Sequence, residues 1–440
     1  MDKYKIAGGI PLKGEIKVSG AKNVAMKLLL AGLLTDEPLV IHNCPLISSV
    51  YGTINLIKPL GVKVSIKDHT LTIEEGTLTS STIPLEMGGL YRTATMVLGP
   101  LLARLGKAIV PNPGGCRLGK RPIDRHIEGL EKMGAKIDYK EGYFVASTSK
   151  LKGTNYKFEK NTHTGTETLI LAAVLAEGDT LLENAAEEPE IDDLINFLNL
   201  MGAKIIRKSR TIRITGVKKL SGVEYTVMPD RNEVVTFASA ALATGGDIVV
   251  SGAQKEYLQV FLDKVSETGA KWEEVDKNKI RLYSYRKLRA TNVTTLPYPG
   301  FMTDWQGPWA ILMTQAGSVS SIHETIYESR FSYVSELKKM GANIEFFHPE
   351  PTNPKDFYNF NWEDKREDYY QGIKISGPTP LHEAVLEVDD LRAGATLVLG
   401  GLVASGTSVV HGIEHIDRGY ENLDLRLRSL GAKIERIKDI

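Results

Sequence analysis

The stretch "MGAKI" occurs at residues 133–137 and again, unchanged, at residues 201–205. Four variants of the same five-residue shape occur elsewhere in the chain: "LGVKV" at 60–64, "TGAKW" at 268–272, "MGANI" at 340–344 and "LGAKI" at 430–434. The copies follow one another at steps of about 70 residues, with a longer last step, and such steps exceed the usual solenoid periods. The six copies therefore indicate duplicated subdomains.

Each copy ends a charged amphipathic stretch, as in "RPIDRHIEGLEKMGAKI" at 121–137. Apolar residues recur there three and four positions apart, and this spacing predicts a helix. The glycine stands at the C-terminal end of that helix, where a residue with positive φ commonly ends a helix before a strand begins. Each copy is thus expected to be a helix, a glycine turn and a strand.

A second repeated element is a stretch rich in small apolar residues that breaks at Gly or Asp and continues with β-branched residues. It occurs as "LLLAGLLTDEPLVIHN" at 28–43, "LILAAVLAEGDTLLEN" at 169–184, "ASAALATGGDIVVSGA" at 238–253 and "LVLGGLVASGTSVVHG" at 397–412. A helix that is apolar on nearly all sides must be buried, whereas the amphipathic helix can face water. The two elements together predict a six-fold α/β unit, with buried helices inside and strands around them.

A chain of 440 residues is too long for one ordinary core. Three units make each half, and the division falls near "MPDRNEVVTF" at 228–237. We expect a first lobe over 22–229 and a second lobe over 1–21 and 230–440, because the N-terminal "YKIAGGIPLKGEIKVSG" looks like a strand pair that needs a partner. A cleft between the lobes is the expected ligand site. Residues at about 345–372 leave the pattern and are expected to be a surface insertion.

The charge balance bears on the partners of the chain. Lys plus Arg and Asp plus Glu both number 54, so no global field draws the chain to nucleic acid or to an anionic membrane. An anionic ligand must instead be held by a local cluster of cations. No uninterrupted apolar run approaches the ~18 residues of a membrane span, and the N-terminal residues show no signal segment.

The only two cysteines are Cys44 and Cys116, and no CxxC pair is present. This usage supports neither a disulfide framework nor a thiolate zinc site, and we expect a reducing, cytoplasmic compartment. Cys44 is expected to be a small core residue. Cys116 lies in "PNPGGCRLGKRP" at 111–122, which is either a wet surface turn or a loop whose cations lower the pKa of the thiol.

Six motifs carry a resemblance to a known family: "SGAKN" at 19–23, "PGGCRLGKRP" at 113–122, "ENAAEEPEIDD" at 183–193, "TDWQ" at 303–306, "DDLRA" at 389–393 and "HIDRGYE" at 415–421. With these motifs, in order over nearly the whole length, the chain resembles the enolpyruvyl transferases. The resemblance implies an α/β fold of two inside-out α/β barrel-like domains, each of three repeated units. It also implies transfer of the enolpyruvyl group of phosphoenolpyruvate to the 3-hydroxyl of UDP-N-acetylglucosamine with release of phosphate, the first committed step of peptidoglycan synthesis.

The resemblance implies that no metal or organic cofactor and no obligate protein partner is needed. It assigns five cations to the anionic groups of the two substrates: Lys22, Arg92, Arg121, Arg392 and Arg418. Guanidinium groups suit carboxylate and phosphate because they donate two parallel hydrogen bonds.

The resemblance also assigns the proton transfers. Cys116 either protonates the methylene carbon or forms a covalent adduct, and the epoxide antibiotic fosfomycin is expected to alkylate this thiol. Asp304 accepts the proton of the sugar hydroxyl, although an aspartate there also suits a helix N-cap. Asp390 either orients Arg392, assists proton transfer or forms a structural ion pair.

At the nucleotide-sugar end, Asn23 and Ile326 match positions that contact the amino sugar, and Pro122 and Asp124 match positions that contact the uracil. Thr164 and Gly165 match a turn whose backbone N–H groups hold the diphosphate.

Several positions at this end depart from the family pattern, so the acceptor is less firmly implied than the reaction. His163 replaces a serine in the diphosphate turn, as a diphosphate contact or as a turn histidine bonded to backbone. Arg125 stands at an apolar position beside the uracil, and "WQGPWA" at 305–310 follows the candidate base. Shikimate 3-phosphate as the acceptor, and an inactive nucleotide-sugar-binding paralogue, stay open as alternatives.

Overall fold

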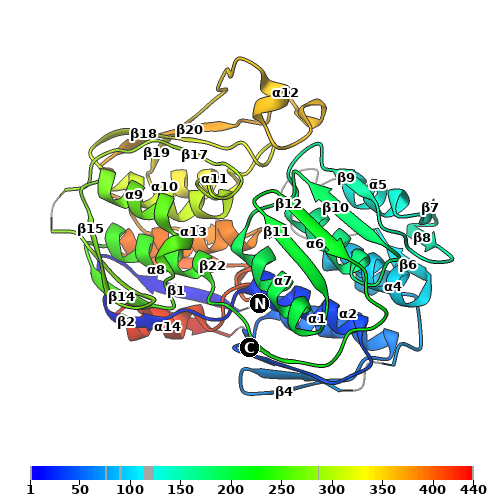
Figure 1. The fold of residues 1–440 in the computed structure, drawn as a ribbon. Helices are drawn as coiled ribbons and strands as arrows, with labels where there is room; N and C mark the ends of the chain where they lie inside the picture. Colours follow the sequence, from blue (N-terminus) through cyan, green and yellow to red (C-terminus); the bar gives the residue numbers. More distant parts are fainter. Residues whose placement is uncertain (1, 75–76, 89–91, 113–122, 286, 439–440) are drawn as a thin grey trace. The chain divides into compact units, whose positions relative to one another are not determined.

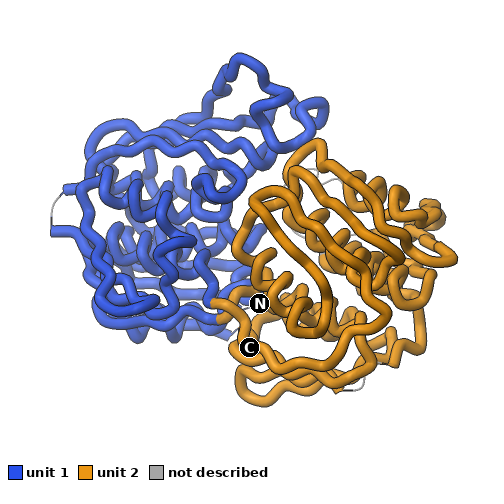
Figure 2. Tube along the Cα trace, viewed as in Figure 1, with its two compact units in different colours: residues 1–19, 116–120, 229–440 blue, residues 20–115, 121–228 orange. Residues whose placement is uncertain are grey.

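The computed structural model describes residues 2–74, 77–88, 92–112, 123–285 and 287–438 (Figure 1). The chain divides into two compact units (Figure 2). Unit 1 contains the described residues up to Ser19 and those from Pro229 onward, and unit 2 contains the described residues from Gly20 to Met228. Within these described ranges, each unit holds three small sheets.

Unit 1 has three four-stranded sheets. Their strand orders are β21-β22-β1-β23, β15-β16-β14-β2 and β17-β18-β20-β19. The strands span β1 Lys3–Ala7, β2 Lys13–Lys17, β14 Asp247–Ser251, β15 Lys271–Asp276, β16 Lys279–Tyr283, β17 Val293–Thr294, β18 Ser318–His323, β19 Asn343–Phe347, β20 Gly372–Gly377, β21 Val385–Glu387, β22 Thr407–His411 and β23 Lys433–Ile437. Its helices are α8 Arg231–Ala243, α9 Gln259–Glu267, α10 Gln306–Thr314, α11 Tyr333–Lys339, α12 Pro354–Phe357, α13 Leu391–Val403 and α14 Leu423–Ser429.

Unit 2 has the sheet orders β13-β3-β5-β4, β6-β8-β7 and β11-β12-β10-β9. The strands span β3 Leu39–His42, β4 Val64–Lys67, β5 Thr70–Ile73, β6 Lys107–Pro111, β7 Lys136–Lys140, β8 Tyr143–Ser147, β9 Asn155–Lys157, β10 Asp179–Glu183, β11 Lys204–Lys208, β12 Thr211–Thr215 and β13 Glu224–Thr226. Its helices are α1 Lys22–Ala31, α2 Ser48–Ile57, α3 Leu85–Gly88, α4 Leu98–Leu105, α5 Asp124–Lys132, α6 His163–Ala173 and α7 Pro189–Leu200.

The repeated pentapeptide behaves alike in all six copies. Its glycines have φ between 86° and 102°: Gly61, Gly134, Gly202, Gly269, Gly341 and Gly431. Each follows a helix or its last turn and precedes a strand, namely β4, β7, β11, β15, β19 or β23. The predicted helix, glycine turn and strand is confirmed in each copy, because a positive φ is the conformation that glycine adopts without steric cost.

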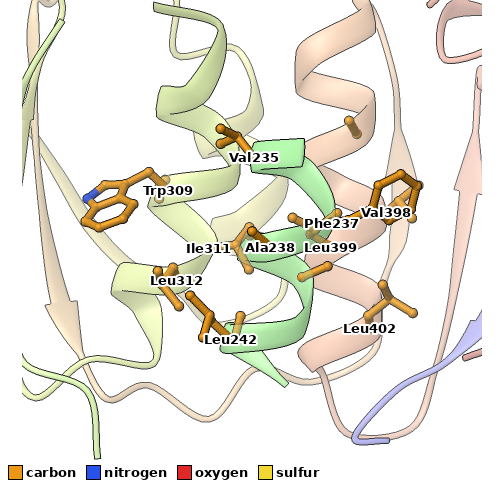
Figure 3. Close-up of a cluster of buried hydrophobic side chains, with 14 of the residues drawn as sticks. Val235, Phe237, Ala238, Leu242, Trp309, Ile311, Leu312, Val398, Leu399 and Leu402 are labelled. Carbon is orange, nitrogen blue, oxygen red and sulfur yellow. The ribbon is translucent and has the colours of Figure 1, made fainter. Parts of the chain in front are cut away.

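The predicted buried helices are also confirmed. Every residue of α8 and α10 is buried, and α13 is buried along most of its length. These three helices pack against one another, and Figure 3 shows side chains of all three, among them Ala238, Ile311 and Leu399, gathered in one cluster. In unit 2, α6 packs against α4, α5 and α7, and α1 packs against α2 and α7.

The N-terminal strands belong to unit 1 but do not form a pair with each other. β1 lies antiparallel between β22 and β23, and β2 lies parallel to β14 in a different sheet. The prediction of a strand pair was therefore wrong. β1 has a neighbour on each side, which leaves it no edge for β2 to pair with, and β2 instead forms the edge of a separate sheet.

The segment that leaves the repeat pattern follows β19 and returns at β20. It contains the short helix α12 and projects from unit 1 at the top of Figure 1. Tyr358 and Phe360 are nevertheless buried, because their rings pack on each other and on Trp362, and the ring of Tyr358 also packs on His323 of β18. Among the described residues, no helix is long and apolar enough to cross a membrane.

Candidate active site

In unit 1, the carboxylate of Asp304 lies between two arginines. Its Oδ1 accepts a hydrogen bond of 2.6 Å from Arg330, and its Oδ2 accepts one of 2.9 Å from Arg392. Asp304 is the middle residue of the 3-10 helix η5 (Thr303–Trp305), and its side chain caps neither η5 nor α10. The helix N-cap interpretation of Asp304 was therefore wrong.

The two guanidinium groups control the charge of Asp304. Burial alone raises the pKa of this carboxyl, but Arg392 and Arg330 act more strongly in the other direction and hold the pKa well below its usual range. The carboxylate is thus ionised throughout the neutral range.

Asp390 positions Arg392 through the backbone. As the N-cap of α13, its Oδ1 accepts hydrogen bonds from the N–H groups of Arg392 at 2.8 Å and Ala393 at 3.1 Å, and its Oδ2 accepts one from Ser332 Oγ at 3.0 Å. The guanidinium of Arg392 instead donates to Asp304 and, at 2.8 Å, to the hydroxyl of Tyr420. Asp390 thus fixes the first turn from which Arg392 projects.

Arg330 and Glu324 were missed by the sequence analysis. Arg330 Nη1 donates to Thr303 Oγ1 at 2.7 Å, and that hydroxyl donates to Glu324 Oε2 at 2.8 Å. Glu324 is fully buried and its Oε1 accepts the N–H groups of Ile326 and Tyr327. The carboxylate of Glu324 therefore ties the turn that carries Ile326 to the Arg330–Asp304 pair.

Arg418 lies half-buried in the turn that joins the 3-10 helix η7 (Ile413–His415) to α14. It stands two residues before Tyr420, whose hydroxyl contacts both Arg392 and Thr236. Ile326 is half-buried as well. Unit 1 therefore brings Asp304, Arg392 and Ile326 into one hydrogen-bonded network and carries Arg418 on a neighbouring turn.

In unit 2, a buried carboxylate likewise lies between two basic groups. Lys22 and Asn23 form the first turn of α1, and one turn later Lys27 Nζ donates to the carbonyl of Asn23 at 2.9 Å. The same ammonium pairs with Glu167 Oε2 at 3.2 Å, and Glu167 Oε1 pairs with His163 Nε2 at 3.1 Å. This cluster, which we name the Lys27–Glu167–His163 triad, connects the beginnings of α1 and α6.

The turn expected to hold a diphosphate is the start of α6. Thr162 is its N-cap, and its Oγ1 accepts the N–H of Gly165 at 3.2 Å. Of the two backbone amides expected to hold the diphosphate, that of Gly165 therefore already has an acceptor. Thr164 is fixed by its side chain, whose Oγ1 is 3.0 Å from His126 Nε2.

The uracil positions lie at the start of α5. Asp124 is exposed as the first residue of that helix. The side chain of Arg125 is largely buried and pairs with the exposed carboxylate of Glu159 at 3.8 Å. Cys44 is buried, which confirms its place in the core.

Four expected site residues are not described. Cys116, Arg121 and Pro122 lie outside the described residues, and Arg92 begins the 3-10 helix η3 (Arg92–Val97) without a described side chain.

The missed residues left a signal in the sequence. Lys27 stands within a stretch of otherwise apolar residues and Glu167 lies just before one, and a charge on a buried helix needs a buried partner. The sequence does not indicate which partner each one takes.

Relatives of the chain cover it from end to end. The sequence model of EPSP synthase (3-phosphoshikimate 1-carboxyvinyltransferase) matches residues 6–427. UDP-N-acetylglucosamine 1-carboxyvinyltransferase 2 of Carboxydothermus hydrogenoformans is 42% identical over 441 residues, with both chains covered completely. UDP-N-acetylglucosamine 1-carboxyvinyltransferase of Idiomarina loihiensis is 43% identical over 440 residues, covering 99% of this chain and 100% of the relative.

Solved structures show the same fold at lower identity. The enolpyruvyl transferase NikO from Streptomyces tendae superposes with a TM-score of 0.86 at 21% identity, covering 100% of this chain and 99% of the other. EPSP synthase from Acinetobacter baumannii superposes with a TM-score of 0.72 at 20% identity, with full coverage of both chains. The sequence model and the full-length relatives together show that the chain belongs to the EPSP synthase family of enolpyruvyl transferases.

Proposed function

We propose that this chain transfers the enolpyruvyl group of phosphoenolpyruvate to the 3-hydroxyl of UDP-N-acetylglucosamine and releases phosphate, in peptidoglycan synthesis. The observation that carries the proposal is the ionised carboxylate of Asp304 between Arg330 and Arg392. A carboxylate can take the proton of an attacking hydroxyl, and buried guanidinium groups can bind a substrate that carries a carboxylate and a phosphate. Relatives at 42% and 43% identity bear the name of this activity.

The proposal gives Asp304 a reason for its low pKa. Before substrate binds, the two arginines keep the carboxylate ionised and hold it in a fixed orientation. An anionic substrate that engages Arg392 takes up part of the positive field, and the pKa of Asp304 then rises toward its usual value. Proton acceptance thus becomes favourable once phosphoenolpyruvate is bound.

The remaining roles are those expected from the family. Lys22, Arg92, Arg121, Arg392 and Arg418 bind anionic groups, and Cys116 serves as proton donor or forms an adduct. The nucleotide sugar is held by Asn23, Pro122, Asp124, His163, Thr164, Gly165 and Ile326. Asp390 acts through the first turn of α13, which supports Arg392. Each unit is proposed to be an inside-out barrel of three repeats, and the repeated sheets and buried helices support this arrangement.

Acceptor-dependent phosphate release tests the function. With phosphoenolpyruvate present, we expect the purified protein to release phosphate when UDP-N-acetylglucosamine is added and not when shikimate 3-phosphate is added. Phosphate release with shikimate 3-phosphate but not with UDP-N-acetylglucosamine would mean that shikimate 3-phosphate is the acceptor. If the protein binds the nucleotide sugar but releases no phosphate from phosphoenolpyruvate with either acceptor, the chain is a nucleotide-sugar-binding protein instead of an enzyme.

A further inference from the structure

The Lys27–Glu167–His163 triad is an unusual use of buried charge. Lys27 is 3% exposed and Glu167 is 0% exposed, and both lie on helices that are buried over most of their length. The side chain of His163 is 24% exposed, so the triad extends from the interior of unit 2 to its surface. Burying such charges is costly unless they are paired, and one carboxylate here pairs with two basic groups.

The geometry fixes which nitrogen of His163 is available. Nε2 faces Glu167 Oε1 at 3.1 Å, whereas Glu167 Oε2 is taken by Lys27 at 3.2 Å. In a neutral imidazole with its proton on Nε2, the other nitrogen, Nδ1, carries a lone pair and repels an anion. In the imidazolium, Nδ1–H is a donor.

The charged and titratable groups around His163 come from each neighbouring element. Glu167 lies on the same helix, Lys27 lies on α1, and Glu188 precedes α7. His126 of α5 reaches the next residue, Thr164, through its Nε2. His163 itself is the first residue of α6, where free backbone N–H groups favour a negative ligand.

We propose that Lys27 and Glu167 are positioning residues that orient His163 and set its charge, and that His163 contacts the diphosphate of the nucleotide sugar through Nδ1 only when the ring is protonated. The proposal rests on the proposed function for the identity of this anion. It makes the affinity for the nucleotide sugar depend on pH, which a serine at this position would not do.

The electrostatics give Lys27 and Glu167 opposite effects. Burial lowers the pKa of His163, but Glu167 raises it by more, Glu188 adds to the rise, and Lys27 opposes it, so that the pKa ends above its usual value. Removing Glu167 should lower the pKa of His163, and removing Lys27 should raise it. The two variants should therefore shift the titration of His163 in opposite directions.

The test compares KM for UDP-N-acetylglucosamine between pH 5.5 and 8.5 in the wild type, His163→Ser, Lys27→Met and Glu167→Gln. In the wild type we expect KM to rise about tenfold as His163 loses its proton, with kcat changing far less, because a charge-assisted hydrogen bond to the anion is lost. His163→Ser should remove that rise. The rise should move to higher pH in Lys27→Met and to lower pH in Glu167→Gln. Lys150→Met, which alters an exposed pair with Glu177, is the matched control and should leave the profile unchanged.

An NMR titration of the His163 ring in the substrate-free protein separates this inference from the proposed function. Opposite pKa shifts in Lys27→Met and Glu167→Gln are expected whether or not the protein turns over substrate. Opposite shifts in a protein that neither releases phosphate nor binds UDP would uphold the charge coupling and overturn the function. An active enzyme would overturn the inference if its two variants shift His163 alike, or if His163→Ser keeps the wild-type KM profile. If Glu167→Gln does not fold, the direction of the His163 pKa shift in Lys27→Met alone tests the inference.

Discussion

One carboxylate in each unit, half-buried Asp304 and buried Glu167, lies between two basic groups, but the partners of the two differ in kind. Asp304 of unit 1 is held by Arg330 and Arg392, which stay charged at every pH the protein meets. Glu167 of unit 2 is held by Lys27 and by His163, an imidazole whose charge, unlike that of a guanidinium, changes with pH. Unit 1 thus keeps a constant field around its candidate base, whereas the field of unit 2 varies with pH.

This difference suits the chemistry that each unit is proposed to serve. A base that takes a proton during turnover benefits from an environment that only the substrate can alter, and two arginines provide it. An anion contact has no such need, so a histidine can replace a serine there and add pH dependence. The predictions below test whether the units differ in this way.

The largest expected effect is on turnover in Asp304→Asn. The amide keeps the shape of the side chain but cannot accept the hydroxyl proton, so kcat should fall by about 10² to 10⁴. Steady-state phosphate release with UDP-N-acetylglucosamine measures it, and circular dichroism checks that the variant is folded. Asp263→Asn, on the exposed face of α9, should retain full activity. A kcat near the wild-type value would remove Asp304 from the chemistry.

The second effect is on the stability of unit 2. Glu167→Gln leaves the buried ammonium of Lys27 without its counter-charge, and we expect a loss of about 3 to 5 kcal/mol in the free energy of unfolding. Urea unfolding followed by hydrogen exchange of the α6 amides locates the loss. Glu177→Gln breaks an exposed pair with Lys150 and should change nothing measurable. Equal losses in the two variants would show that the buried triad adds nothing.

Local features of the fold were predictable from the sequence, and the charge networks were not. A glycine turn after a helix and a buried apolar helix depend on neighbouring residues, so six glycines and four apolar stretches were enough to predict the repeats. The pairing of Asp304 with Arg330, or of Lys27 with Glu167, depends on contacts between distant segments, and one sequence does not specify them. Asp390 directly precedes a long apolar helix, which is an N-cap signal that could have predicted its role.

A third prediction concerns the pH dependence of unit 2. Burial raises the pKa of Asp193 on α7 to about 6, although the hydroxyl of Tyr225 and the N–H of Met228 donate to it. Because the unfolded chain releases this proton near its usual value of 3.8, stability should fall as pH rises from about 4 to 6, and then level off. The fall is at most about 3 kcal/mol, at about 1.4 kcal/mol per pKa unit.

Asp193→Asn removes this titration and should flatten the fall between pH 4 and 6, whatever its effect on absolute stability. Hydrogen exchange of the α7 amides at several pH values measures the slope in this unit alone. An unchanged slope would mean that another group of unit 2 is responsible for it.

An effect of similar size is expected in unit 1, and it has the opposite sign. Burial lowers the pKa of His323 on β18 to about 4, and the ring contacts Tyr358 through Nε2 at 3.0 Å and stacks on Phe357. The stability that the neutral ring contributes is present above its unfolded pKa of about 6.5 and is lost as pH falls toward 4. The segment between β19 and β20 should therefore open more often in acid, by at most about tenfold per pH unit.

Limited proteolysis at pH 7 and pH 4.5 measures this opening. His323→Phe keeps an aromatic ring that cannot be protonated, and it should make cleavage independent of pH in this range. If the wild-type segment is instead cleaved faster at pH 7 than at pH 4.5, both units lose stability in the same direction and the contrast between them fails.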